Sequence, residues 1–253
     1  MSVFIPLDRL DALARKFCIG PYAKVQEQKL ASAESTEFDI IEQSDSFVLK
    51  GIPYLGGHQD IAWGKELLNN GQTLTQDSWT DFLQKSEWQL PDALTYHATL
   101  AALYQHKDGF QSQLVERVRS VFSKYFRKNL LMTGTRVVYE PQGNDVVKHS
   151  HDEVPAVIVG ANGRVNAESG FEDSIEVLLG TRDLTEVEDV YLWLSERKPY
   201  LRRLNNRSNQ RIERVVVLGV EDDRFNIYCY DYFDYSWPAL GVVYMGAKKF
   251  HEE

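Results

Sequence analysis

The spacing of apolar residues changes once along the chain, close to Asn129. Before this point apolar side chains recur every three or four positions, which is the period of an amphipathic helix. The pattern predicts three helices, at about 75–83, 91–103 and 114–125. A helical layer is therefore expected in the middle of the chain.

After Asn129, short β-branched and aromatic runs replace the helical period and predict strands. The expected strands cover 136–139, 146–151, 156–159, 164–166, 211–219, 224–232 and 240–245. Two helices are expected between them, one within 169–180 and one that begins at Asp183, which forms a capping box with Glu186. The acidic turn Glu221-Asp222-Asp223 predicts an antiparallel hairpin.

The region before residue 75 has weaker signals. Apolar spacing predicts a short helix at 7–17, and the polar stretch 21–46 is the best candidate for a linker. Short extended segments are expected at 47–49 and 52–55. A glycine-bearing turn then leads into a helix expected at 59–69.

These elements predict the α+β class, with a helical layer packed on a mostly antiparallel β-sheet. The helical layer is expected at about 58–128 and the sheet at about 130–246. A single domain, 1–253, is the favoured organisation at this chain length. The alternative is a boundary near residue 129 that separates a helical domain from a β-rich domain.

Composition restricts the classes of protein. Hydrophobic residues make up 43% and charged residues 26% of the chain, as in ordinary globular proteins, and no apolar run is long enough to cross a membrane. Cys18 and Cys229 lack metal-binding spacing, which fits a reducing compartment such as the cytoplasm. The net charge of -9 disfavours nucleic acid as a default partner, unless a local patch binds it.

The stretch from Gly143 to Gly163 contains a candidate metal site. On a single strand, His149, His151 and Glu153 would lie on one face at two-residue steps, so that two imidazoles and a carboxylate would converge. Such a set of ligands suits a divalent transition metal with open positions for a substrate. The alternative is a polar strand or turn whose histidines bond to neighbouring carboxylates.

The same stretch resembles the first conserved motif of the cupin family. The resemblance rests on Gly143, the His149-x-His151 pair, the acid Glu153 and Gly160, with a strand and a glycine turn after them. It implies a metal-dependent enzyme whose ligands include these two histidines and this acid.

Two further stretches are candidate binding surfaces. Alternation on the strand 224–232 places Tyr228, Tyr230 and Tyr232 on the face opposite Phe225, Ile227 and Cys229. With Trp237 nearby, an exposed row of tyrosines would bind a sugar ring or a protein partner. If helices cover that face, the tyrosines are instead core residues.

The second stretch is a basic run with tyrosine and asparagine residues between its members: Arg197, Lys198, Arg202, Arg203, Arg207, Arg211 and Arg214. Among these, Arg202, Arg203 and Arg207 are the best candidates to contact an anion or nucleic acid. The alternative is that the arginines neutralise acidic side chains of the protein itself.

Three functional hypotheses follow from these sites. The first is a noncatalytic protein that binds a ligand, a protein partner or a second copy of itself through the arginine run and the tyrosines. The second is a metal-dependent, cupin-like enzyme, and the third is a weak binder of anions or nucleic acid. No hydrolase, metalloprotease or dinucleotide-binding motif is present.

Overall fold

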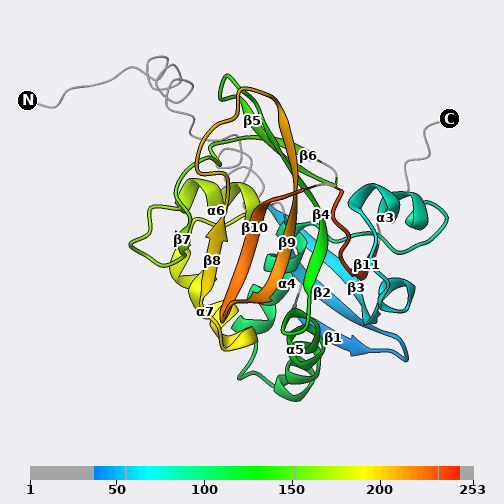
Figure 1. Ribbon diagram of the computed structural model, residues 1–253. Helices are drawn as coiled ribbons and strands as arrows, with labels where there is room; N and C mark the ends of the chain where they lie inside the picture. Colours follow the sequence, from blue (N-terminus) through cyan, green and yellow to red (C-terminus); the bar gives the residue numbers. More distant parts are fainter. Residues whose placement is uncertain (1–36, 55, 151, 233, 246–253) are drawn as a thin grey trace, which may run out of the picture.

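The computed structural model describes residues 37–54, 56–150, 152–232 and 234–245, without the side chains of residues 230 and 231 (Figure 1). Its helices are α3 (Gln76–Leu83), α4 (Ala93–Gln105), α5 (Ser112–Phe126), α6 (Glu172–Leu179) and α7 (Leu184–Ser195), with a short 3-10 turn at Leu68–Gly71. Its strands are β1 (Asp39–Glu42), β2 (Ser46–Tyr54), β3 (Gly57–Leu67), β4 (Leu130–Tyr139), β5 (Asp145–His149), β6 (Asp152–Ala156), β7 (Gly163–Arg164), β8 (Pro199–Arg202), β9 (Ile212–Glu221), β10 (Arg224–Tyr232) and β11 (Leu240–Met245).

The strands form two sheets. The smaller sheet has the order β1-β2-β3-β11, and the larger has the order β6-β5-β4-β9-β10-β8-β7. Neighbouring strands are antiparallel except β10 and β8, which are parallel. The fold belongs to the α+β class, as the pattern predicts.

Helix α4 lies at the centre of the main core, with β2 of the smaller sheet and helices α6 and α7 packed against it (Figure 1). Ten of its residues are buried, because apolar and small side chains occupy every side of the helix. Its Tyr96 ring lies 4.9 Å from the ring of Trp63 on β3 and 5.5 Å from that of Phe126 on α5. A helix of this kind is stable only where other elements cover it all round.

A second, smaller core covers the opposite face of the larger sheet. It contains Trp79, Leu83, Leu90, Leu130, Met132, Val215, Val217, Tyr228 and Ala239. Helix α3 and the segment before β11 supply its outer layer, and Trp79 donates its indole N–H to the carbonyl of Trp237. Because residues 215–219 of β9 are buried on both faces, this part of the strand is continuously apolar instead of alternating.

Most of the expected elements are present. The three helices of the first half are α3, α4 and α5, and the two of the second half are α6 and α7. Asp183 caps α7 by accepting hydrogen bonds from the amides of Thr185 and Glu186, and β9 and β10 form the expected hairpin. No helix in the described part of the chain is long and apolar enough to cross a membrane.

Two expectations need correction, and two remain untested. The helix expected at 59–69 is wrong, because this stretch is β3, which pairs with β2 on one side and β11 on the other. The last strand, β11, joins the smaller sheet and not the larger one. The helix expected at 7–17 lies outside the described residues, and the single domain stays a prediction.

A buried polar cluster fixes the start of α4. Asp92 is fully buried and caps the helix by accepting hydrogen bonds from the Thr95 amide at 2.6 Å and the Thr95 hydroxyl at 2.7 Å. Its other carboxylate oxygen accepts from the Tyr54 hydroxyl at 2.9 Å. Since Thr95 gives its proton to Asp92, the Tyr244 hydroxyl donates to Thr95. This carboxylate thus joins β2 directly, and β11 through Thr95, to the central helix.

We predict that Asp92→Ala lowers the free energy of unfolding by about 2 to 4 kcal/mol, since it removes a helix cap and leaves a largely buried hydroxyl without its acceptor. Urea unfolding measures this loss. The matched control is Thr75→Ala, which removes the exposed cap of α3 and should cost only about 1 kcal/mol. Equal costs for the two variants would contradict a special role for the buried cluster.

Candidate functional site

His149 is a structural residue at the end of β5. Its Nε2–H donates to the carbonyl of Val177 on α6 at 2.9 Å, so its Nδ1 accepts from the Thr135 hydroxyl at 3.0 Å. That hydroxyl also accepts from the amide of Ala93 at the start of α4. Both ring nitrogens are therefore occupied, and burial lowers the pKa of the imidazole.

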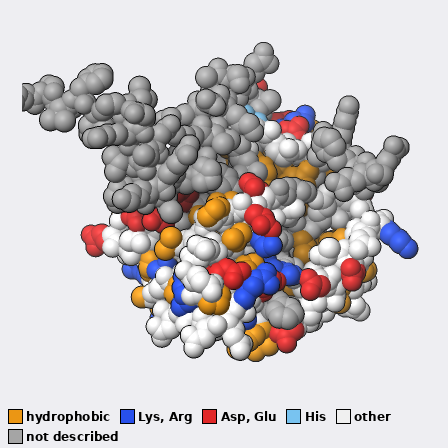
Figure 2. All heavy atoms as spheres, turned by 90° about the horizontal axis from the view of Figure 1, so that it is seen from above, with side chains coloured by type: hydrophobic (Ala, Val, Ile, Leu, Met, Phe, Trp, Pro, Cys, Tyr) orange, Lys and Arg blue, Asp and Glu red, His pale blue; other side chains and the backbone are white. Residues whose placement is uncertain are grey.

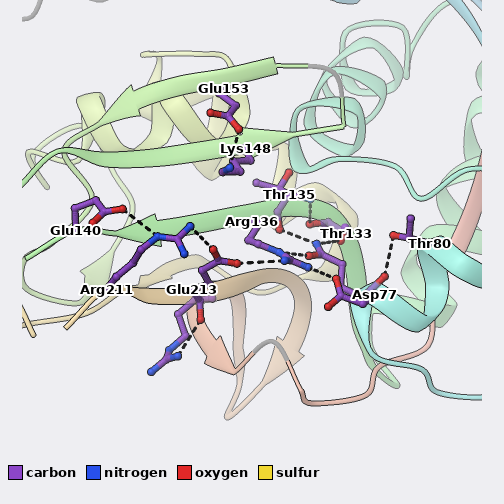
Figure 3. Close-up of polar contacts among 12 residues, drawn as sticks. Asp77, Thr80, Thr133, Thr135, Arg136, Glu140, Lys148, Glu153, Arg211 and Glu213 are labelled. Atoms are coloured by element: carbon purple, nitrogen blue, oxygen red, sulfur yellow. Dashed lines mark hydrogen bonds and ion pairs between the residues drawn. The ribbon is translucent and has the colours of Figure 1, made fainter. Parts of the chain in front are cut away.

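The single strand expected for the metal site is wrong. β5 ends at His149 and β6 begins at Asp152, so the motif turns through a hairpin in which Lys148 pairs with Glu153. His149 points into the core, whereas Glu153 is exposed and forms an ion pair with Lys148 at 2.7 Å (Figure 3). The two proposed ligands therefore lie on opposite faces of the hairpin.

His151 lies outside the described residues, so the metal site and its divalent transition metal remain untested as a whole. Within the described ranges, no group of three or more His, Cys, Asp and Glu side chains could hold a metal ion. The cupin-like spacing therefore has no support from the positions of His149 and Glu153.

Ion pairs cover the outer face of β4 and β9 near this hairpin (Figure 3). Arg136 donates to Gln76 at 2.8 Å and pairs with Asp77 at 2.5 Å and Glu213 at 3.2 Å. Arg211 bridges Glu213 and a second acid on the same face, Glu140. The basic groups here are paired with acidic ones, so little net charge remains to attract a charged ligand.

The tyrosines of β10 do not form the expected exposed row. Tyr228 is only 3% exposed, packs in the second core and donates its hydroxyl to Glu221. Trp237 is partly buried against the same core. Tyr232 is exposed and lies 5.4 Å from Tyr235, while the side chain of Tyr230 is outside the described residues. The row is interrupted because α3 and the segment before β11 cover the middle of this face.

Two of the three arginines selected from the basic run serve the protein's own structure. Arg207 forms a two-pronged pair with the buried carboxylate of Asp145, at 2.6 and 2.9 Å. Arg203 donates to the carbonyl of Ala161 and to the hydroxyl of Ser174, and burial lowers its pKa. On the face shown in Figure 2, blue basic side chains likewise lie next to red acidic ones. These two arginines are not free to bind a ligand.

Arg202 connects the two candidate surfaces. The parallel pairing of β8 with β10 places Arg202 opposite Tyr228, and its guanidinium carbon lies 4.9 Å from the centre of that ring. The same carbon is 5.6 Å from the centre of the Tyr200 ring, and the guanidinium carbon of Arg224 lies 4.4 Å from the centre of that same ring. These four side chains, Tyr228, Arg202, Tyr200 and Arg224, form an alternating stack that we call the cation–aromatic ladder.

The ladder ends at a shallow cleft of about 620 Å³ between the end of α7, the start of β8 and the β9–β10 turn. The cleft is lined by Arg164, Leu192, Glu196, Arg197, Lys198, Pro199, Tyr200, Asp223 and Arg224. Four of these nine residues are basic and two are acidic, on a protein whose net charge is -9. The cleft therefore concentrates positive charge against the overall balance.

Three of these basic side chains have acidic partners. Glu188 pairs with both Arg164 and Lys198, and the Arg164 guanidinium holds the pKa of Glu188 below its usual value. Arg197 pairs with Asp223 at 3.4 Å. Arg224 differs, because none of the ion pairs among the described residues involves it, and its guanidinium rests on the ring of Tyr200.

The backbone beside the cleft is unusual. Glu196 ends α7 at φ 59°, and Asp222 and Asp223 form the β9–β10 turn at φ 51° and 58°, a region that favours glycine. The carboxylate of Asp222 pairs with Arg202 at 3.3 Å, and that of Asp223 pairs with Arg197 at 3.4 Å. The turn thus positions two cations, at a modest cost in backbone strain.

No protein family model, no curated protein and no solved structure matches this chain. The cleft must therefore be interpreted from its own chemistry. Sequence reasoning missed Arg164 and Arg224, which lie outside the basic run. The one available signal was Tyr200, an aromatic residue within a cluster of basic side chains.

We predict that the free energy of unfolding falls as the pH is lowered from about 6.5, the pKa of an unperturbed histidine, towards the lower pKa of folded His149. In this interval the unfolded chain binds a proton that the buried imidazole excludes. Above this interval His149 makes its full contribution to the free energy of unfolding. Within the interval that contribution falls as the pH is lowered, by up to about 1.4 kcal/mol per pH unit.

Urea unfolding between pH 5 and 7.5 measures this dependence. His149→Gln should be less stable than the wild type at pH 7.5 and should have a shallower slope below pH 6.5. His58→Gln, which replaces an exposed histidine, serves as the control. If the free energy of unfolding of His149→Gln depended on pH as steeply as that of the wild type, the assignment of this dependence to His149 would be refuted.

Proposed function

We propose that this is a noncatalytic binding protein whose cleft takes a small anionic ligand bearing a carboxylate or a phosphate. The observation that carries the proposal is Arg224, an exposed guanidinium stacked on Tyr200 without an acidic partner among the described residues. A planar guanidinium binds carboxylate and phosphate through two parallel hydrogen bonds. The ring of Tyr200 limits its motion, so less entropy is lost when an anion binds.

The neighbouring charges support an anion at this position. Lys198 is half-exposed and shares its acidic partner Glu188 with Arg164, so two cations compete for one carboxylate. Arg197 is also partly exposed, and its partner Asp223 is 91% exposed at the tip of the turn. An ion pair this exposed is weak and is easily exchanged for a ligand.

The size and charge of the site favour a small molecule over a polymer. A volume of about 620 Å³ falls within the usual range of small-molecule sites. The net charge of -9 opposes the approach of a polyanion, while a small anion interacts mainly with the nearest cations. Because the cleft is shallow, we expect weak binding that decreases as salt is added.

We predict that inorganic phosphate shifts the backbone amide NMR signals of residues 196–200 and 222–224, and that Arg224→Gln weakens binding by at least about tenfold, the equivalent of one lost charge-assisted contact. A titration followed by ¹⁵N–¹H correlation spectra measures both effects. The control is Lys85→Gln, which makes the same change of charge at an exposed residue after α3.

The control variant should bind like the wild type. Shifts spread evenly over basic surface residues, or equal weakening in Arg224→Gln and Lys85→Gln, would show general charge attraction and refute a specific site. Tighter binding of long nucleic acid strands than of phosphate, through the same residues, would favour a nucleic-acid binder instead.

A further inference from the structure

The cation–aromatic ladder ends at a cation, Arg224, that contacts only one aromatic ring among the described residues. Tyr228, its inner end, is buried, and its hydroxyl is bound to Glu221. The guanidinium carbon of Arg202 lies 4.9 Å from the centre of the Tyr228 ring and 5.6 Å from that of the Tyr200 ring. Arg224, the outer end, contacts only the ring of Tyr200 among the described aromatic residues, and it lines the cleft.

Each planar cation in such a stack is stabilised by the negative faces of the rings beside it. Arg202 contacts two rings, whereas Arg224 contacts one ring and lines the cleft. An aromatic ring placed in the cleft would complete the alternation by stacking on the open face of Arg224. Leu192, which is 38% exposed, adds apolar surface in the same cleft.

We infer that the ligand of the cleft is an aromatic anion, a planar heteroaromatic ring that carries a phosphate or carboxylate group. This inference rests on the proposed function and specifies its ligand. The ring stacks on Arg224, and the anionic group pairs with the adjacent cations Arg197 and Lys198. Stacking and charge then act together, so the ring adds to the affinity of the anion alone.

The acidic residues of the cleft are consistent with a nitrogen heterocycle. Glu196 and Asp223 place carboxylates, 67% and 91% exposed, on its rim. These carboxylates repel a second anionic group but accept hydrogen bonds from ring or amino N–H groups. A ligand with one anionic end and one N–H-bearing ring therefore matches both signs of charge in the lining.

The test compares two probes that differ only in the ring, adenosine monophosphate and ribose 5-phosphate. Isothermal titration calorimetry with the wild-type protein should give an affinity about tenfold higher for adenosine monophosphate, a gain typical of one stacked base. Arg224→Lys retains the positive charge but removes the planar guanidinium on which the ring would stack. The ratio of the two affinities should therefore fall towards one. Lys85→Gln should leave the ratio unchanged.

A measurement on the wild-type protein does not depend on how the variants fold. Adenosine monophosphate should shift the side-chain Nε–Hε signal of Arg224 upfield through the ring current, and ribose 5-phosphate should not. Equal affinity for the two probes, or a ratio that survives in Arg224→Lys, would overturn the aromatic ligand while leaving the anion site in place. If neither probe binds, both the inference and the proposed function fail.

Discussion

The burial of α4 is the constraint on which the rest of the structure depends. This helix has apolar or small side chains on every side, so it cannot rest on a sheet with one face in water. The smaller sheet, the larger sheet and helices α5, α6 and α7 enclose it together. Segments distant in sequence are brought together as a result, among them β3 and β11.

Buried polar groups define how these elements meet. Asp92 fixes the first turn of α4 against β2 and β11, and the chain of hydrogen bonds through Thr135 and His149 fixes the same turn against β4, β5 and α6. Apolar packing alone tolerates small shifts, whereas a buried carboxylate or imidazole is stable only when its partners are in place. These residues therefore hold the surrounding elements in fixed positions relative to α4.

The arginines likewise differ in whether other groups of the protein occupy their guanidinium groups. Arg203 and Arg207 donate their hydrogen bonds to groups of the protein itself, and Arg202 contacts two aromatic rings and Asp222. Arg224 stands at the edge of this arrangement, where its charge is oriented but not neutralised. A binding site is best recognised by such an unmatched group, and a large number of basic residues is not sufficient.

The sequence by itself determined the α+β class, the five described helices and the β9–β10 hairpin, because these depend on local period, capping residues and turn chemistry. It did not determine β3, since the stretch 57–67 suits a helix or a strand and only pairing with β2 and β11 decides between them. The positions of the candidate residues also required the tertiary structure. The turn between His149 and Glu153, the cover over Tyr228 and the stack of Arg224 on Tyr200 all depend on contacts between distant segments, which spacing along one chain does not encode.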